Sequence, residues 1–558
     1  MAQPTRLTSS LIEEYLDKGY WTKTTLLDAL AKHARCYPDR EAVVDSRRRL
    51  TWRQVEEETD RQALALLDMG LPRDAVVVVQ LPNWVEEFLL RFSLKKAGLL
   101  GAFVPVVWRQ TEMSSVLQQL KPVAWVIPET FHGFDFVVMS QGLQREYPRL
   151  RVAVVGERAA RGTILFSEWC AASFASGDRQ RLEQVRYGPF EVTMITVSSG
   201  STGAPKLSEV PEQGQLLDGQ GIAQRLGIVT EDVVGVFAPL SGGPGTMTWY
   251  TGVFAGAKMV LADDFSGERL LSLIEKEQIR FVGTAPAIAM RLVECPSLQR
   301  YDVSSLRVMR TGAAHLPPSV AEMAERRLGC VIAAAAGTVE TGTFAQAGVD
   351  DPPEIRLGGS VGRSLPGVEL QVVDEQGQPL PPGAMGELWI RGPATGSGYF
   401  RNVDATLLAW GELGANGWFR SGDLACIDGQ GYVTLVGRKT DMINRGGQKV
   451  YPAEIEALLA RHPQILEAVV IGLPHPGLGE TPCVCIVPKE DHALTLEEVV
   501  DFLRHRKIAA YKLPTEMVVV EDFPRGQTIR VNRRLLAQRV LAERLAKEEG
   551  NATSDAAG

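Results

Sequence analysis

The sequence predicts an α/β protein built from a large N-terminal domain, with parallel βαβ sheets and a β-rich subdomain, and a small α+β C-terminal domain. Three observations carry this prediction. Apolar runs alternate with helical patterns from residue 75 to about 283, antiparallel hairpin patterns begin after residue 360, and a separate α+β pattern fills residues 441–540. A chain of 558 residues is also too long for one hydrophobic core.

The elements of the large domain follow in order. Residues 24–70 predict a helix, a short hairpin and a second helix, because Leu26, Leu27 and Leu30 recur at helical spacing. The helix 86–97, flanked by two apolar runs, is typical of a βαβ unit. The apolar runs predict parallel strands at 75–79, 101–106, 123–127, 152–155, 192–197, 234–237, 258–261 and 281–283.

Antiparallel structure is predicted further on. The runs 368–373 and 387–390 flank one turn, and residues 423–436 form a hairpin that turns at 428–431. In the C-terminal module we expect helices at 452–461, 495–507 and from about 531, with strands at 466–472, 482–487 and 516–520. The polar residues 545–558 predict a disordered tail.

Composition excludes several classes of protein. The net charge of −8 argues against a nucleic-acid-binding protein. The N-terminus lacks the apolar region of a signal peptide, and no apolar stretch is long enough for a membrane span. The seven cysteines are scattered, and the close pair Cys483 and Cys485 alternates as in a strand, so we expect free thiols in a reducing compartment. The sequence therefore predicts a cytoplasmic enzyme.

A loop rich in glycine and hydroxyl residues follows the strand 192–197. Glycines allow close approach of a ligand, backbone N–H groups and hydroxyls bind anions, and a lysine adds positive charge, so the loop predicts a polyphosphate site. Its spacing differs from that of a Walker loop. Taken alone, the segment is also compatible with an ordinary Gly/Ser loop. The residues concerned are Ser198, Ser199, Gly200, Ser201, Thr202, Gly203 and Lys206.

Further motifs accompany this loop. They include Gly386-Glu387-Leu388, Gly398-Tyr399, Trp418 to Asp423, Gly437-Arg438, Asp441-Met442-Ile443, Gly446-Gly447 and Pro452 to Glu456. With these motifs, the chain resembles the adenylate-forming superfamily of acyl-CoA ligases, aryl-acid adenylating enzymes and luciferases, over nearly its whole length and especially in its acyl-CoA ligase branch.

The resemblance implies a two-step reaction: a carboxylate attacks the α-phosphate of ATP, and a thiol, that of CoA or of a carrier protein, then displaces AMP from the acyl-adenylate. It also implies a large domain 1–436, a hinge 437–440 centred on Thr440, and a small mobile domain 441–544. The cofactors expected are CoA, the AMP moiety of the acyl-adenylate, ATP and Mg²⁺.

Site residues are carried over by position. Lys206 belongs to the phosphate loop, Asp423 and Arg438 would hold the ribose, and Glu340 would lie near Mg²⁺ and act in catalysis. The segment Gly312-Ala313-Ala314 would line the adenine and acyl sites, Gly337-Thr338-Val339 would contact the nucleotide, and Gly446-Gly447 would border the pantetheine tunnel.

Two departures from the family pattern concern adenylation. The C-terminal motif 524–536 has Ile529-Arg530 where the family has Gly-Lys, so a planar guanidinium replaces a compact ammonium and a flexible glycine is lost. Val339 stands where the family has a threonine, and it cannot hydrogen-bond to a phosphate oxygen. The family's lysine bridges the carboxylate and the α-phosphate in the first half-reaction only.

These departures favour a ligase specialised for the second half-reaction, which would receive an acyl-adenylate from a partner adenylating ligase, as in diterpenoid antibiotic biosynthesis. Three alternatives stay open: a complete two-step acyl-CoA ligase, a stand-alone adenylating enzyme that loads a carrier protein, and an inactive binding or scaffold homologue.

The expected acyl pocket has small residues where relatives carry larger ones. Ala336 replaces an aromatic residue, and no bulky gate follows the strand 234–237. We therefore expect a bulky, hydrophobic, cyclic or polycyclic acid. The pocket residues predicted are Ser241, Gly242, Gly243, Met247, Trp249, Ala335 and Ala336.

Overall fold

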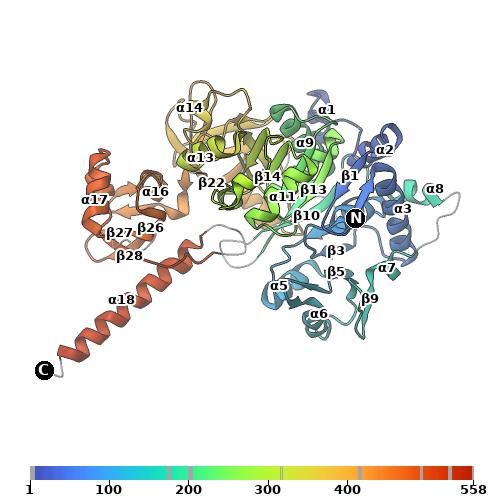
Figure 1. The fold of residues 1–558 in the computed structure, drawn as a ribbon, viewed down its shortest axis with the longest axis horizontal. Coiled ribbons are helices and arrows are strands. Elements are labelled where there is room, and N and C mark those ends of the chain that lie inside the picture. Colours follow the sequence, from blue (N-terminus) through green and yellow to red (C-terminus); the bar gives the residue numbers. More distant parts are fainter. Residues whose placement is uncertain are drawn as a thin grey trace.

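The computed structural model describes residues 7–171, 178–198, 205–314, 316, 318–411, 417–489, 494–525 and 531–555. Its N-terminal part contains two large mixed sheets (Figure 1). In spatial order, the strands of the first sheet are β18 (Arg363–Ser364), β17 (Gly342–Gln346), β16 (Val331–Thr338), β15 (Val308–Thr311), β14 (Phe281–Thr284), β12 (Val233–Phe237), β13 (Lys258–Leu261), β1 (Glu41–Val44) and β2 (Arg49–Thr51).

The second sheet is parallel in its interior and antiparallel at one edge. Its strands, in spatial order, are β21 (Gly398–Tyr399), β11 (Lys206–Pro211), β10 (Val192–Ser198), β4 (Leu100–Phe103), β3 (Val76–Val79), β5 (Ala124–Pro128), β8 (Arg151–Val155) and β9 (Thr163–Leu165). Every residue of β3 is buried, as expected for an apolar run covered on both faces. The predicted parallel strands are confirmed.

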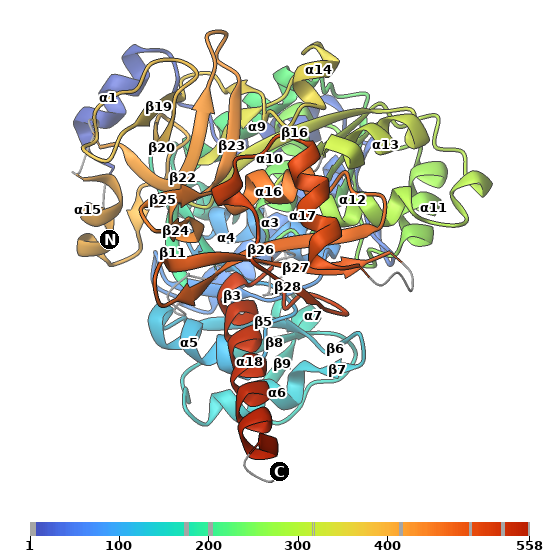
Figure 2. The ribbon, with the colours of Figure 1, turned by 90° about the vertical axis from the view of Figure 1, so that its left-hand side faces the viewer.

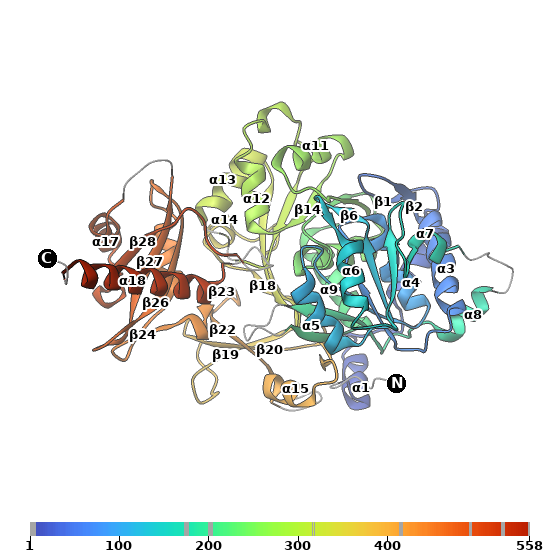
Figure 3. The ribbon, with the colours of Figure 1, turned by 90° about the horizontal axis from the view of Figure 1, so that it is seen from below.

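One hydrophobic core joins the two sheets. It includes Val77 of β3 and Val236 of β12, together with apolar residues of α4 (Val85–Lys96) and α10 (Gly243–Ala255). Separate clusters pack on the outer faces, so the domain is layered (Figure 3). The other helices of this part include α2 (Leu26–Cys36), α3 (Trp52–Asp68), α5 (Gln110–Leu120), α6 (Phe136–Gln144), α9 (Glu212–Leu226), α11 (Gly267–Glu277), α12 (Pro286–Val293) and α13 (Pro318–Leu328).

The predicted β-rich subdomain is an antiparallel sheet of β19 (Glu369–Val373), β20 (Met385–Arg391), β22 (Phe419–Ile427) and β23 (Val433–Arg438). The carboxylate of Asp428 accepts hydrogen bonds from the N–H groups of Gln430 and Tyr432, each at 2.9 Å, and so fixes the predicted hairpin turn between β22 and β23. Helix α15 (Val403–Trp410) precedes this hairpin in the chain.

The C-terminal domain is the predicted α+β module. Its elements are β24 (Ile443–Arg445), β25 (Gln448–Val450), α16 (Pro452–Leu459), β26 (Ile465–His475), β27 (Gly479–Pro488), α17 (Leu496–His505), β28 (Glu516–Val519) and α18 (Arg533–Asp555). Two hydrophobic clusters form on the two faces of its sheet, with α16 and α17 on one face and α18 on the other (Figure 2). Cys483 and Cys485 lie in β27, as the alternation predicted, and all seven cysteines are free thiols.

Helix α18 runs on to Asp555 and so includes described residues of the segment 545–558, for which the sequence predicts a polar tail. Its residues Leu545-Ala546-Lys547-Glu548-Glu549 are strong helix formers. Within the described residues, no helix combines the length and the apolar character that crossing a membrane requires.

The start of α18 is fixed to the rest of the domain by Arg533. Its guanidinium donates to both carboxylate oxygens of Glu456 in α16, at 2.6 and 2.8 Å, and to the carbonyl of Val470 in β26, at 2.7 Å. Just before α18, Arg525 and Val531 form an antiparallel bridge, and the N–H of Asn532 donates to the carbonyl of Pro524 at 2.7 Å.

Replacement of this anchor should loosen the domain locally. We expect Arg533→Ala to lower the free energy of local unfolding of β26 by about 2 kcal/mol, because charge-assisted hydrogen bonds contribute roughly 1.5–3 kcal/mol. Hydrogen exchange followed by mass spectrometry measures this change. Arg534→Ala, on the exposed side of the same turn, is the control and should leave β26 unchanged. Equal protection of β26 in both variants would contradict the assignment.

Candidate active site

The predicted phosphate loop connects two antiparallel strands. Ser198 ends β10 and pairs directly with Lys206, the first residue of β11, and on its other side β11 pairs with β21. The loop residues Ser199, Gly200, Ser201, Thr202 and Gly203 lie outside the described residues, as does Arg530. The strand β11 was not predicted from the sequence.

Lys206, Tyr399 and Glu340 form a polar cluster beside this loop. The Lys206 ammonium nitrogen lies 3.5 Å from the Tyr399 hydroxyl and 5.6 Å from the centre of its ring. The same hydroxyl donates to Glu340 Oε1 at 2.8 Å, and burial, together with the neighbouring carboxylate, raises the pKa of Tyr399. The structure therefore brings Lys206 and Glu340 to one place. Sequence reasoning missed Tyr399 as a site residue, although the Gly398-Tyr399 motif marked its position.

A tight turn presents Glu340. It follows Gly337 and Thr338 at the end of β16, and the Thr338 hydroxyl accepts hydrogen bonds from the N–H groups of Glu340 and Thr341, each at 3.2 Å. The Glu340 carbonyl accepts from the N–H of Gly396 at 2.6 Å. Val339 lies half-exposed in this turn and presents a methyl surface.

The two small-residue segments lie side by side. Gly312 follows β15 directly, and a methyl group placed on it would lie 3.5 Å from the carbonyl of Ala335 in β16. Ala313 adopts a left-handed φ of 72°, which costs an L-residue roughly 1–2 kcal/mol. Ala314 is half-buried, and Ala335 and Ala336 are buried. The chain thus turns sharply at the carboxyl end of β15, next to the end of β16.

A buried polar network supports this region from behind. Arg310 of β15 donates to the Gln346 side-chain oxygen at 2.7 Å and to the Thr343 hydroxyl at 3.0 Å, both in β17. Asp218 of α9 accepts from the N–H of Thr343 at 2.9 Å. Burial raises the pKa of Asp218 to about 8, and it lowers the pKa of Arg310 to about 10. Side chains of β15 and α9 therefore fix the β16–β17 hairpin that carries Glu340.

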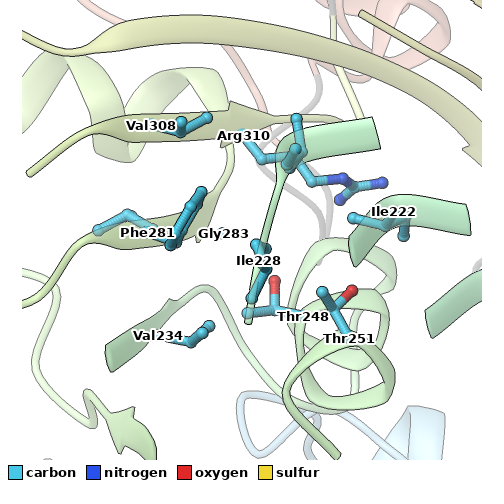
Figure 4. Close-up of a pocket in the computed structure, with 11 residues that line it drawn as sticks. Ile222, Ile228, Val234, Thr248, Thr251, Phe281, Gly283, Val308 and Arg310 are labelled. Carbon is cyan, nitrogen blue, oxygen red and sulfur yellow. The ribbon is translucent and has the colours of Figure 1, made fainter. Parts of the chain in front are cut away.

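Figure 4 shows a small cavity at one side of this network, with Arg310, Thr248, Thr251 and Ile222 among its lining residues. Its volume is about 10 Å³, which is close to the minimum for one water molecule. The cavity is too small for any carboxylic acid substrate.

Asp423 and Arg438 face each other across β22 and β23. They are paired in register, and Arg438 Nε lies 2.9 Å from Asp423 Oδ1. The Ser421 hydroxyl accepts from the N–H of Asp423 at 3.0 Å and donates to the carbonyl of Leu388 at 2.6 Å, which fixes the backbone around the aspartate. The Arg438 side chain is more exposed, at 43%, than that of Asp423, at 13%, so the pair has an open side.

The predicted hinge residue Thr440 lies in a short 3₁₀ turn, Lys439–Asp441, between the domains. Lys439 contacts Glu387 of the N-terminal part at 2.9 Å, and Asp441 contacts Arg533 of the C-terminal domain at 3.4 Å. Gly446 and Gly447 form the two-residue turn between β24 and β25, with φ values of 60° and 86° that favour glycine at both positions.

The predicted acyl-pocket residues divide into two groups. Ser241 and Gly242 are half-buried and Gly243 is exposed at the start of α10, and Met247 is half-buried one turn later. Trp249 is completely buried and contacts Phe88 and Phe92 of α4. Trp249 therefore packs in the core, where α10 faces α4, and presents no surface to solvent in this structure.

Comparison with known proteins decides the family. The model of AMP-binding enzymes matches residues 30–400, more than half of the chain, and that of the AMP-binding enzyme C-terminal domain matches residues 454–529. The chain belongs to the AMP-binding enzyme family.

Two curated relatives and one solved structure illustrate the similarity. The medium-chain fatty-acid–CoA ligase of Escherichia coli (strain K12) is 30% identical over 530 residues, 94% of this chain and 92% of the relative. The 2-hydroxy-7-methoxy-5-methyl-1-naphthoate–CoA ligase of Streptomyces carzinostaticus is 29% identical over 530 residues, 94% of each chain. The anthranilate CoA ligase AuaEII, solved with anthranoyl-AMP, superposes with a TM-score of 0.82 at 22% identity, covering 93% and 97%.

As a member of the AMP-binding enzyme family, the chain is an AMP-forming acid–thiol ligase, and enzymes of this family use ATP, CoA and Mg²⁺. The structural neighbours confirm the predicted fold, a large N-terminal domain with parallel sheets and a smaller C-terminal domain.

The buried carboxyl of Asp218 makes a pH-dependent contribution to stability. Between pH 4 and 8 the unfolded chain ionises this group while the folded protein keeps it protonated, so the unfolding free energy falls by about 1.4 kcal/mol per pH unit from this group alone. We expect Asp218→Asn, which still accepts from the N–H of Thr343, to remove that slope in urea unfolding measured from pH 5 to 8.

The control for this experiment is Asp302→Asn in an exposed loop, which should unfold with the wild-type slope. Parallel pH curves for Asp218→Asn and the wild type would show that the carboxyl is ionised in the folded protein, against the expectation.

Proposed function

We propose that this enzyme is an acyl-CoA ligase for a bulky cyclic or polycyclic carboxylic acid, specialised for the transfer of the acyl group from a preformed acyl-adenylate to CoA. The observation that carries the proposal is Arg530, which occupies the position of the adenylation lysine in the C-terminal motif. The ribose-site pair Asp423 and Arg438 and the Gly446-Gly447 turn accompany it unchanged.

The transfer needs little from the phosphate-binding machinery. The thiolate sulfur of CoA attacks the carbonyl carbon of the acyl-adenylate, a C–S bond forms, and the bond between that carbon and the phosphate oxygen breaks so that AMP leaves with the electron pair. The mixed anhydride is already activated, and the enzyme contributes chiefly orientation. Asp423 accepts hydrogen bonds from the ribose hydroxyls in this proposal, and Arg438 orients the carboxylate.

Adenylation places stricter demands on the site. Negative charge builds up between the attacking carboxylate and the α-phosphate, and a single well-placed donor is worth roughly 10²–10³ in rate. Arginine carries the charge of the lysine but distributes it over a planar fork that needs more room. Val339 removes a second polar group from the same half-reaction, because a valine cannot donate to a phosphate oxygen.

The residues around Glu340 suit a magnesium–nucleotide complex. Mg²⁺ is commonly bound through one or two carboxylates together with substrate phosphates and water. Among the described residues no cluster of three or more acidic, histidine or cysteine side chains forms a complete metal site, so the phosphates would have to supply ligands. Glu340 would contribute a carboxylate, and Lys206 would contact the phosphates.

The acyl group would be bound near Gly312, Ala335 and the loop Ser241–Gly243. The residues of these segments are small, which leaves room for a wide ring system. The similarity to a naphthoate–CoA ligase supports a fused-ring or comparably bulky acid as substrate. A partner ligase that adenylates the acid would supply the acyl-adenylate.

A complete two-step ligase is the second candidate. The observation that favours it is the cluster of Lys206, Tyr399 and Glu340, which keeps both a phosphate-binding cation and a carboxylate for Mg²⁺. The two candidates differ in one property, the ability to use ATP and the free acid.

The first experiment compares two routes to the thioester. We expect wild-type protein to form acyl-CoA from synthetic 1-adamantanecarbonyl-AMP and CoA but not from ATP, Mg²⁺ and the free acid, with products measured by mass spectrometry. The double variant Val339→Thr/Arg530→Lys should raise the ATP-dependent rate by roughly 10²–10³, because it restores a compact donor at the α-phosphate.

Arg525→Lys is the matched control, since Arg525 lies in the same motif but pairs with Glu467. It should leave both routes at the wild-type level. Efficient ATP-dependent product with the wild type would favour the complete ligase, and no product from either route would overturn the proposed function.

A separate experiment tests the ribose site. Asp423→Asn should weaken AMP binding about 10- to 100-fold, because it replaces charge-assisted hydrogen bonds by neutral ones. Isothermal titration calorimetry with AMP measures the change. Asp404→Asn, an exposed residue in the first turn of α15, should bind AMP as the wild type does. Unchanged affinity in Asp423→Asn would place the ribose elsewhere.

A further inference from the structure

Helix α4 buries several charged side chains in the core between the two large sheets. The side chains of Glu87 and Arg91, one helical turn apart, are each 1% exposed, and Arg91 Nη2 lies 3.1 Å from Glu87 Oε1. Burial raises the pKa of Glu87 to about 7. A second buried pair on the same helix joins Lys96 to Asp60 of α3, at 2.5 Å. Buried ion pairs add little to stability, because desolvation offsets their attraction. Stability alone therefore does not explain why these charged residues lie in the core.

The Arg91 guanidinium reaches the segment between β12 and α10. It donates to the carbonyl of Leu240 at 2.7 Å, and its charge lies 4.2 Å from the ring centre of Phe103 and 5.4 Å from that of Trp249. The Thr246 hydroxyl of α10 donates to the same carbonyl, at 2.5 Å. Leu240 directly precedes Ser241, the first residue of the proposed acyl-site loop.

Asn83, just before α4, holds the same segment from its other side. Its amide nitrogen donates to the carbonyl of Ala238 at 2.8 Å, and its amide oxygen accepts from the N–H of Leu240 at 2.7 Å. Three side chains thus fix the backbone of residues 238–240. The loop Ser241–Gly243 has small side chains of its own, so its position depends on this anchorage.

We propose that Arg91, held by Glu87, is a positioning residue that fixes the loop Ser241–Gly243 and thereby sets the discrimination between large and small acyl groups. The inference rests on the proposed function in one respect, the placement of this loop beside the acyl group. Arg91 touches neither substrate nor cofactor in this proposal and acts through the carbonyl of Leu240. Among the described residues, no hydrogen bond or ion pair joins Lys96 or Asp60 to residues 238–243.

The test measures binding of two non-hydrolysable acyl-adenylate analogues, 5′-O-(N-acylsulfamoyl)adenosine with a benzoyl or a 1-adamantanecarbonyl group, by calorimetry on the full chain. The wild type should prefer the adamantyl analogue. Arg91→Met should reduce the ratio of the two affinities by about tenfold, since small shifts of a pocket wall change discrimination by one to two powers of ten. AMP itself should bind as tightly as to the wild type.

Lys96→Met is the matched control, because it removes a buried cation from the same helix. It should lower the melting temperature about as much as Arg91→Met but leave the affinity ratio unchanged. Arg91→Lys, which keeps the charge, should recover part of the ratio. Equal loss of affinity for both analogues in Arg91→Met, or the same change of ratio in Lys96→Met, would overturn the inference and leave Arg91 a structural residue.

The two proposals fail separately. A wild type that binds both analogues equally overturns the inference on Arg91, since there is no discrimination to set. A wild type that discriminates between the analogues but forms no thioester from acyl-AMP and CoA overturns the proposed function and leaves the positioning role of Arg91 to be decided by the affinity ratio alone.

Discussion

The parallel direction of the central strands is the constraint on which the candidate site depends. In the first sheet, the segment 238–243 follows β12, Gly312-Ala313-Ala314 follows β15, and the turn with Glu340 follows β16, while the phosphate loop follows β10 of the second sheet. Parallel strands bring their carboxyl ends to one edge of a sheet, and ligands of open α/β sheets bind outside that edge. Segments more than a hundred residues apart in the chain can therefore contribute side chains to one site.

The sequence predicted the parts of the molecule whose signal is local. Apolar runs such as Val76–Val79 identify buried strands, and the turn at 428–431 identifies a hairpin, because each pattern is complete within a few residues. The motifs likewise singled out Lys206 and Glu340, which the structure brings together, and Asp423 and Arg438, which it pairs. What the sequence could not predict depends on distant partners: Tyr399 joins Lys206 and Glu340 only after β21 has paired with β11.

Two further features depend on context that a local pattern does not carry. Trp249 follows β12 in the chain, and the face of α10 on which it lies packs against α4. The described residues beyond 545 continue α18, in keeping with their intrinsic helical preference. The buried Asp218–Arg310 network could not be found either, because a carboxylate and a guanidinium separated by 92 positions resemble ordinary surface residues in a sequence.

The bridge between Arg525 and Val531 closes the base of the segment that contains residue 530. Pro524 and Asn532 reinforce it, and Arg533 joins it to α16 and β26. Each end of this segment is therefore attached to the domain by contacts of its own. Substitutions between the two anchors leave these contacts in place, so this part of the chain can vary in evolution while the domain keeps its fold.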